Sequence, residues 1–238
     1  MLKGVPSDFQ YDLVGEDRYR IESNANVSTV TYGGTERLSV SRDGRALRFD
    51  ARASYVRQSP DGRSSSSARF VSELLPDGSF ENTVDNDPDF LTLLNQPFAV
   101  QLDAATVRDL RELHGSGPFS AGSPVGGAEL RGSLRHGIDG SIDGLPTVAV
   151  RFEAAGPMDG TLPGSSNTVL AGTMRMDGTA YYSLAGGLLL ALRATLTIDA
   201  RVREGRPVVV VPVQIVYKRW IRVAQPARDL RQALRMPR

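Results

Sequence analysis

The segment from Gly186 to Trp220 is the most apolar part of the chain, and its pattern places the strongest limit on the fold. A membrane-spanning helix needs roughly 18 to 20 consecutive apolar residues. The longest uninterrupted run, Leu188 to Leu192, ends at Arg193, and a second short run contains Pro212. A buried helix is also unfavourable, because Arg193 would lie within its apolar face. Neither kind of helix is therefore predicted.

Alternation with a period of two accounts for the same segment. Apolar residues occupy every second position in two successive runs, while the positions between them are mostly polar. The runs are Leu188, Leu190, Leu192, Ala194, Leu196, Ile198, Ala200 and Val202, then Val209, Val211, Val213, Ile215, Tyr217, Ile221 and Val223. A turn signal, Glu204-Gly205-Arg206-Pro207, separates them. The pattern predicts a hairpin of two strands of about fifteen residues, each with one buried face.

Strand length then constrains the sheet. Fifteen extended residues span roughly 50 Å, and strands of that length twist and coil. We therefore expect the sheet to curve strongly, toward a half-barrel or a barrel. Pro212 cannot donate a hydrogen bond to a neighbouring strand, so its strand is predicted to lie at an edge of the sheet or to be bulged there.

The remainder of the chain repeats this pattern of strands and turns. Asp-Gly pairs, which suit tight hairpin turns, predict turns at Asp43, Asp61, Asp77, Asp139, Asp143, Asp159 and Asp177. One strand carries Leu47, Phe49, Ala51, Ala53 and Tyr55 on its apolar face, and the next carries Ala68, Phe70, Ser72 and Leu74. Further strands are expected near residues 19–23, 27–32, 36–41, 98–102, 128–135, 147–154, 168–176 and 179–184.

Three segments have the signals of short helices. Residues 103–114 offer Asp103 as N-cap and Gly115 as the stop, and residues 87–95 offer Asp87 as N-cap followed by Pro88. Residues 225–235 are either a basic helix or a frayed tail. Residues 115–127 are rich in Gly, Ser and Pro and are predicted to form a loop.

The predicted fold is mainly β: a large, strongly curved antiparallel sheet of long meandering strands, half-barrel or barrel-like, with two or three short helices packed on it. A single domain over residues 1–238 is the favoured organisation. The alternative is two similar β halves, 1–102 and 116–224, linked by the helix at 103–114 and the loop at 115–127.

Composition narrows the function more by exclusion than by motif. The net charge of +1, with 23% charged residues, gives no reason to expect nucleic acid as a partner. The absence of Cys excludes disulfides and thiolate sites. His114 and His136 are interpreted as helix-end and turn residues, and Ser123 lacks the spacing of a nucleophile elbow. Asp85 to Asp89 begin like a calcium loop, but Phe90 and Gln96 stand where the pattern needs Gly and Glu. We therefore predict no catalytic residue, metal or cofactor.

Three functions remain, in order of preference. The first is a non-catalytic binding or carrier protein, with a hydrophobic small molecule or lipid held in the concave face of the sheet. The ligand-binding residues expected there are Leu188, Leu190, Leu192, Leu196, Ile198, Val211, Ile215, Tyr217, Phe49 and Phe152. We call this concave face the trough. In its layout, the predicted trough resembles bacterial half-barrels such as the LolA-type lipoprotein carriers, a resemblance that implies lipid binding.

The second function is a structural or interaction scaffold that uses an edge strand or an Arg-rich outer face, with Arg48, Arg52, Arg193, Arg201 and Arg203 exposed. The third is a hydrolase or isomerase with carboxylates in the trough. Residues 1–6 lack the apolar run of a signal peptide. The chain is thus expected to be either cytoplasmic or exported with its leader removed, and the oligomeric state stays open.

Overall fold

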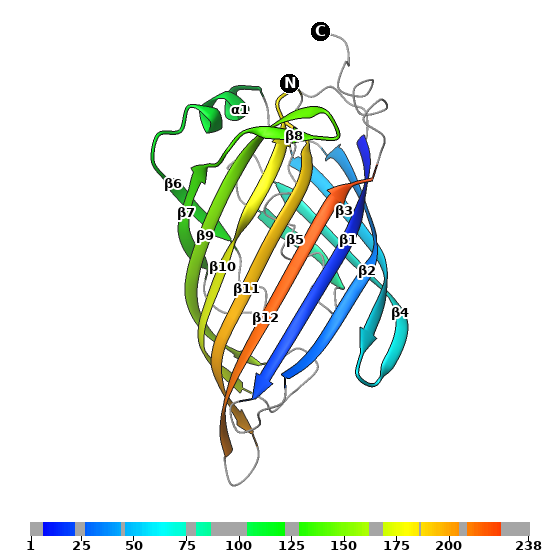
Figure 1. The fold of residues 1–238 in the computed structure, drawn as a ribbon, viewed down its shortest axis with the longest axis vertical. Coiled ribbons are helices and arrows are strands. Elements are labelled where there is room, and N and C mark those ends of the chain that lie inside the picture. Colours follow the sequence, from blue (N-terminus) through cyan, green and yellow to red (C-terminus); the bar gives the residue numbers. More distant parts are fainter. Residues whose placement is uncertain are drawn as a thin grey trace.

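The computed structural model describes residues 7–21, 27–43, 46–74, 80–86, 104–121, 129–161, 169–185, 187–204 and 209–224. These residues form a single antiparallel sheet of twelve strands and one helix, α1 (Ala104–Arg111). The strands are β1 (Ser7–Ile21), β2 (Val27–Asp43), β3 (Ala46–Ser59), β4 (Gly62–Leu74), β5 (Phe80–Asn86), β6 (Gly117–Ala121), β7 (Leu130–His136), β8 (Gly140–Ile142), β9 (Leu145–Thr161), β10 (Val169–Ser183), β11 (Leu189–Glu204) and β12 (Val209–Val223). Figure 1 shows the long strands lying side by side and strongly tilted.

The strand order is that of two meanders joined at their outer strands. One meander runs from β1 to β5 and the other from β6 to β12, with β8 paired only to β9. The antiparallel pairing of β1 with β12 joins them, so the strand order begins with β5 and ends with β6. The single-domain organisation of residues 1–238 stays a prediction.

The alternation of side chains decides which face is buried. In β11, Leu190, Leu192, Leu196 and Ile198 are buried, while Arg193 between them is exposed. β3 follows the same rule, so one face of the sheet is mainly apolar and the other mainly polar. We call these the inner and outer faces. The predicted hairpin is confirmed as β11 and β12, whose register runs from Glu204 opposite Val209 to Ala191 opposite Arg222.

The edge position predicted for the Pro212 strand is wrong. β12 lies between β1 and β11, and its register with β11 is unbroken at Pro212. The pairing with β1 ends at Val213, opposite Ile21. Pro212 therefore lies beyond the described pairing of β1 with β12, and its missing N–H removes no hydrogen bond from that pairing.

Two predicted turns are wrong, because a strand continues through each of them. Asp159-Gly160 lies inside β9, and Asp177-Gly178 lies inside β10. By contrast, Asp143 and Gly144 do form a tight turn, with φ of 50° and 74°, and Asp61 precedes Gly62 in the turn between β3 and β4. β2 ends at Asp43 and β8 follows Asp139, whereas Asp77 lies outside the described residues.

At Gly178, glycine serves close packing between strands. A Cβ there would lie 2.1 Å from the carbonyl oxygen of Arg193 and 2.5 Å from the ring of Phe152. The sequence alone does not distinguish a glycine that allows close packing of strands from a glycine that allows a positive φ angle in a turn.

Other strands are longer than predicted. The strands expected at 27–32 and 36–41 are one strand, β2, and those at 168–176 and 179–184 are one strand, β10. β1 begins well before residue 19, and β5 was not expected. β6 occupies residues 117–121 of the predicted loop. The predicted strand at 98–102 lies outside the described residues.

The predicted helix at 103–114 is confirmed in its central part. α1 contacts β7 and β9, places Val107 in the core, and lies beyond one end of these strands in Figure 1. It therefore lies at the end of the sheet. The helices expected at 87–95 and 225–235, with Asp87, fall outside the described residues, as does Asp103. None of the described helical structure is long and apolar enough to span a membrane.

Gly33 and Gly34 provide a matched test of packing in β2. A Cβ on Gly34 would lie 2.2 Å from the Ser54 carbonyl oxygen and 2.6 Å from the Tyr55 Cα, whereas one on Gly33 meets nothing within 4 Å. We expect Gly34→Ala to lower the free energy of unfolding by about 1–3 kcal/mol or more through overpacking. Gly33→Ala should raise it by about 0.5–1 kcal/mol, because glycine weakens a strand. Urea unfolding measures the stability of both variants. Equal effects would contradict the assignment of Gly34 to the inner face and Gly33 to the outer face.

Candidate ligand-binding site

The inner face holds the ligand-binding residues expected from the sequence. All except Val211, which is half-buried, belong to the buried core. The core members are Leu188, Leu190, Leu192, Leu196, Ile198, Ile215, Tyr217, Phe49 and Phe152. Their role in binding a ligand stays a prediction.

Cross-strand register brings most of these residues together. Ile198 lies opposite Ile215, and Leu196 lies opposite Tyr217, in neighbouring strands. Phe152 lies two strands away in β9, where its ring packs against Phe119 with ring centroids 5.6 Å apart. Phe49 is on β3, separated from β12 by β1 and β2. The row is thus continuous from β9 to β12, and Phe49 belongs to a different part of the inner face.

A buried polar cluster interrupts the apolar inner face. Asp17 on β1 and Arg219 on β12 are only 1% and 2% exposed, and they form an ion pair. The hydroxyl of Tyr32 donates to Asp17 at 2.8 Å, and that of Tyr19 donates to the same carboxylate oxygen at 3.4 Å. We call Asp17, Arg219, Tyr19, Tyr32 and Tyr217 the inner polar cluster.

Aromatic rings surround the buried guanidinium. The Arg219 guanidinium carbon lies 5.2 Å from the ring centre of Tyr32 and 5.6 Å from that of Tyr217. Arg219 Nη1 also donates a hydrogen bond to the Lys218 carbonyl oxygen at 2.9 Å. Gly15, which has no side chain, lies between Tyr32 and Arg219 in the register, and this leaves room for the stacked groups. Buried charge is thus compensated by an ion pair, hydrogen bonds and ring faces.

The same environment changes the acidity of the tyrosines. Burial, reinforced by the negative charge of Asp17, raises the pKa of Tyr217 to about 12. Burial and Asp17 also raise the pKa of Tyr19, and burial raises those of Tyr11 and Tyr182. These phenols therefore stay protonated at neutral pH and act as hydrogen-bond donors or apolar surface.

Sequence reasoning missed this cluster although a signal was present. Arg219 stands in the alternating row between Tyr217 and Ile221, at a position that the period assigns to the inner face. Asp17 has the same relation to Leu13 on β1. A charged residue in phase with an apolar row is the signal that would have identified both members of the pair.

His136 lies at the end of a strand, as expected, whereas His114 lies beyond the helix that it was expected to end. His136 at the end of β7 lies 2.8 Å from the Asp139 carboxylate, which also accepts from Arg111 of α1 at 3.2 Å. Although partial burial acts to raise the pKa of Asp139, these two hydrogen bonds hold it below its ordinary value. His114 is exposed and lies beyond the end of α1 at Arg111.

The described residues contain no cluster of three or more His, Asp or Glu that could hold a metal. The calcium-like run at residues 85–89 falls outside the side chains described here, and so does Ser123.

The arginines of the outer face differ in their partners. Arg48 pairs with Glu73 at 3.1 Å, Arg52 pairs with Asp50 at 3.3 Å, and Arg193 stacks on Trp220 at 5.6 Å. Arg201 and Arg203 are exposed on β11. The predicted outward orientation of these residues is confirmed, while their use in assembly stays a prediction.

The buried ion pair generates a first test. We expect Asp17→Asn or Arg219→Met alone to destabilise the fold by about 3–5 kcal/mol, because each leaves one charge buried without its partner. The double variant should lose clearly less stability than the sum of the losses in the two single variants. The exposed pair Arg131 and Glu129 is the control, where Arg131→Met should have little effect on stability because solvent screens the two charges. Additive losses in the buried pair would contradict the coupling.

Alkaline titration generates a second test. Because the pKa of Tyr217 rises from 10.0 to about 12 on folding, the folded state binds this proton more tightly. The resulting stabilisation is complete below pH 10 and is lost as the pH rises toward 12. Phenolate absorbance should therefore show fewer ionised tyrosines at pH 11 in the folded protein than in denaturant, where all seven titrate together. Coincident titration curves would contradict the burial of these phenols.

Comparison with known proteins does not assign the chain to a family. No family model matches it, and no curated protein matches it. Among solved structures, it is similar to the crystal structure of the β domain of the Bordetella autotransporter BrkA, with 9% identity and a TM-score of 0.19 over 90% of this chain and 98% of that one. A likeness at that TM-score carries no argument for fold or function. What the chain does must therefore be inferred from its own residues.

Proposed function

We propose that this chain is a non-catalytic binding or carrier protein that holds an apolar or lipid-like ligand against the inner face of its sheet. The observation that carries the proposal is that, within the described residues, the apolar face is far more extensive than the helical structure that packs on it. The core draws residues from β1 to β4, from β6 and β7, and from β9 to β12. The one described helix, α1, packs mainly against β7 and β9 at the end of the sheet. A face of this extent needs something to pack against.

Glycines in the sheet support the curved, concave form that the proposal needs. Four glycines, Gly34, Gly132, Gly172 and Gly178, have backbone of a neighbouring strand within 1.9 to 2.2 Å of where a Cβ would lie. Glycines at such positions allow strands to bend. In Figure 1, β5 is drawn behind β11 and β12, which agrees with a sheet that curves back on itself. A half-barrel is the form that we propose.

The chemistry of the inner face also supports this function. Met158, Met174 and Met176 lie in adjacent strands of the core. Thioether side chains are unbranched and adapt their shape to an apolar partner. Two carboxylates, Asp17 and Glu36, are buried on this face, and Asp17 is engaged by Arg219.

The distinguishing experiment is native mass spectrometry with lipid extraction, combined with a substitution that fills space. Ala180 is fully buried on the inner face, between Val150 and Leu192 in the register, and Ala155 is exposed on the outer face. We expect the purified protein to carry an extractable apolar molecule. Ala180→Phe should remove it with little loss of stability, because the ring takes the place of the ligand.

Ala155→Phe is the matched control and should retain the ligand. If the inner face is instead packed only against protein, no adduct will be found. In that case Ala180→Phe will lower the free energy of unfolding by about 1–3 kcal/mol through overpacking. That result would overturn the carrier function.

A further inference from the structure

A hollow on the outer face, opposite to the proposed carrier site, has charges that its neighbours do not neutralise. It has a volume of about 420 Å³ and is formed by β7, β9 and β10. This volume falls within the range of small-molecule sites, roughly 300–1,000 Å³. Gly178 and the inner-face residue Phe152, which lie opposite each other in neighbouring strands, also line it. The polar residues that line it are Ser133, Arg135, Arg151, Glu153, Arg175, Asp177 and Thr179.

Two arginines at one side of the hollow face each other. Arg135 on β7 and Arg151 on β9 are direct partners in the register, so their side chains leave the same face of the sheet at adjacent points. Like charges in that position repel each other. Within the described part of the chain, neither guanidinium has a carboxylate within the 4.0 Å of an ion pair. Arg69, elsewhere on the outer face, has Asp50 at 2.8 Å.

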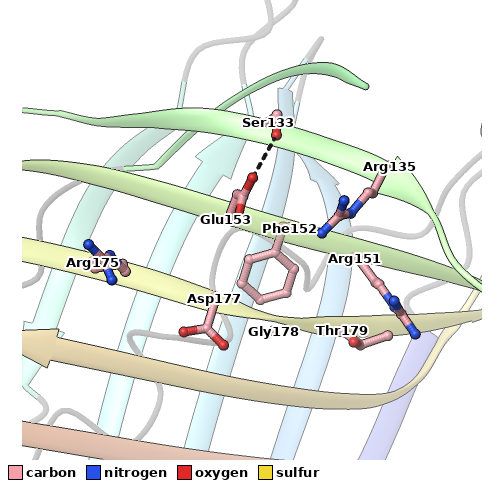
Figure 2. Close-up of a pocket in the computed structure, with 9 residues that line it drawn as sticks. All are labelled: Ser133, Arg135, Arg151, Phe152, Glu153, Arg175, Asp177, Gly178 and Thr179. Atoms are coloured by element: carbon pink, nitrogen blue, oxygen red, sulfur yellow. Dashed lines mark hydrogen bonds between the residues drawn. The ribbon is translucent and has the colours of Figure 1, made fainter. Parts of the chain in front are cut away.

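Two carboxylates repeat this arrangement beside the arginines. Glu153 and Asp177 are direct register partners on β9 and β10, and each lies two residues along its strand from Arg151 or Thr179. Glu153 accepts a hydrogen bond from the Ser133 hydroxyl at 3.4 Å. Two residues of extended strand span roughly 7 Å. Figure 2 shows Arg135, Arg151 and Thr179 together on one side, with Glu153 and Asp177 nearer Arg175.

Opposite charges in the hollow are neighbours in two ways. Arg151 and Glu153, like Arg175 and Asp177, are two residues apart on one strand, and Arg151 is diagonal to Asp177 across β9 and β10. None of these neighbours forms an ion pair in the described structure. The hollow thus has two arginines on one side and two acids beside Arg175 on the other, with a formal charge of +1 from three arginines and two acids.

We infer that this hollow binds a small phosphorylated amine, with its phosphate between Arg135 and Arg151 and its ammonium group near Glu153 and Asp177. Two guanidinium groups and the Thr179 hydroxyl supply more donors than a carboxylate can accept, whereas a phosphate accepts them readily. The acidic pair accepts hydrogen bonds from the ammonium group, and a phosphate alone would lack that contact. A ligand of this kind relieves both like-charge pairs at once. The same chemistry occurs in a soluble metabolite and in a lipid head group.

Calorimetry at low ionic strength tests the assignment with three probes: O-phosphoethanolamine, inorganic phosphate and ethanolamine. We expect O-phosphoethanolamine to bind at least tenfold more tightly than either of the other two. The double variant Arg135→Gln/Arg151→Gln should lose at least tenfold in affinity for both phosphates. Asp177→Asn should weaken O-phosphoethanolamine and leave inorganic phosphate unchanged. Arg201→Gln, which removes an exposed arginine of β11 outside the hollow, is the matched control and should change nothing.

Binding to lipid vesicles distinguishes the two sources of the ligand, a lipid head group and a soluble metabolite. Flotation with phosphatidylcholine vesicles that contain phosphatidylethanolamine, compared with pure phosphatidylcholine vesicles, reports a lipid head group. Binding of the soluble probe without flotation reports a metabolite. Either result supports the site, since both carry the same phosphorylated amine.

Thermal unfolding shows whether a variant that fails to bind is still folded. O-Phosphoethanolamine should raise the melting temperature of the wild type and leave that of the double arginine variant unchanged. No binding of any probe would overturn the inference, as would equal affinity for inorganic phosphate or an equal loss in Arg201→Gln. Because these residues are on the outer face, failure here leaves the inner-face function untouched.

Discussion

The pairing of β1 with β12 is the contact on which the rest of the structure depends. It joins residues more than two hundred positions apart, such as Asp17 and Arg219, and unites two meanders that would otherwise be separate sheets. It also forms the inner polar cluster, because Asp17 and Tyr19 come from β1, while Arg219 and Tyr217 come from β12. A charged pair in the interior is costly unless it is fully compensated. The cluster therefore restricts the register of this one junction, since a slip of one residue would move Arg219 to the outer face.

The two faces of the sheet have opposite electrostatic arrangements. On the inner face, the Asp17–Arg219 pair is enclosed by tyrosine rings and hydroxyl groups. On the outer face, some arginines are matched by carboxylates, as Arg69 and Arg48 are by Asp50 and Glu73, and others, such as Arg201 and Arg203, are exposed. In the hollow over β7, β9 and β10, arginines and carboxylates lie close together, yet like charges stand opposite each other in the register. This arrangement is the basis of the ligand site on the face that the carrier function does not use.

Much of the fold could be predicted from period-two alternation alone. The rows from Leu188 to Val202 and from Leu47 to Tyr55 identified the strands and their buried faces, because alternation is local. The interpretation of every Asp-Gly pair as a turn between strands was wrong. Asp-Gly at residues 177–178 suits both a turn and a close approach of strands, and only the neighbouring Phe152 and Arg193 decide between them. The position of Pro212 depended on where β1 ends, which lies in a distant part of the sequence. The outer hollow was equally hidden, because the Arg135–Arg151 opposition exists only once β7 and β9 are in register.

The junction of β1 and β12 also has a consequence for the order in which the sheet is completed during synthesis. β12 emerges after every other strand, yet it is inserted between β1 and β11 in the middle of the sheet. Until then β1 and β11 both present unpaired backbone groups and adjacent apolar rows, which are the features that promote association between chains. The five amino-terminal strands must wait, with this edge open, for the last strand to be made. A nascent chain of this design has a long interval in which a chaperone, or a second copy of itself, competes with its own final strand.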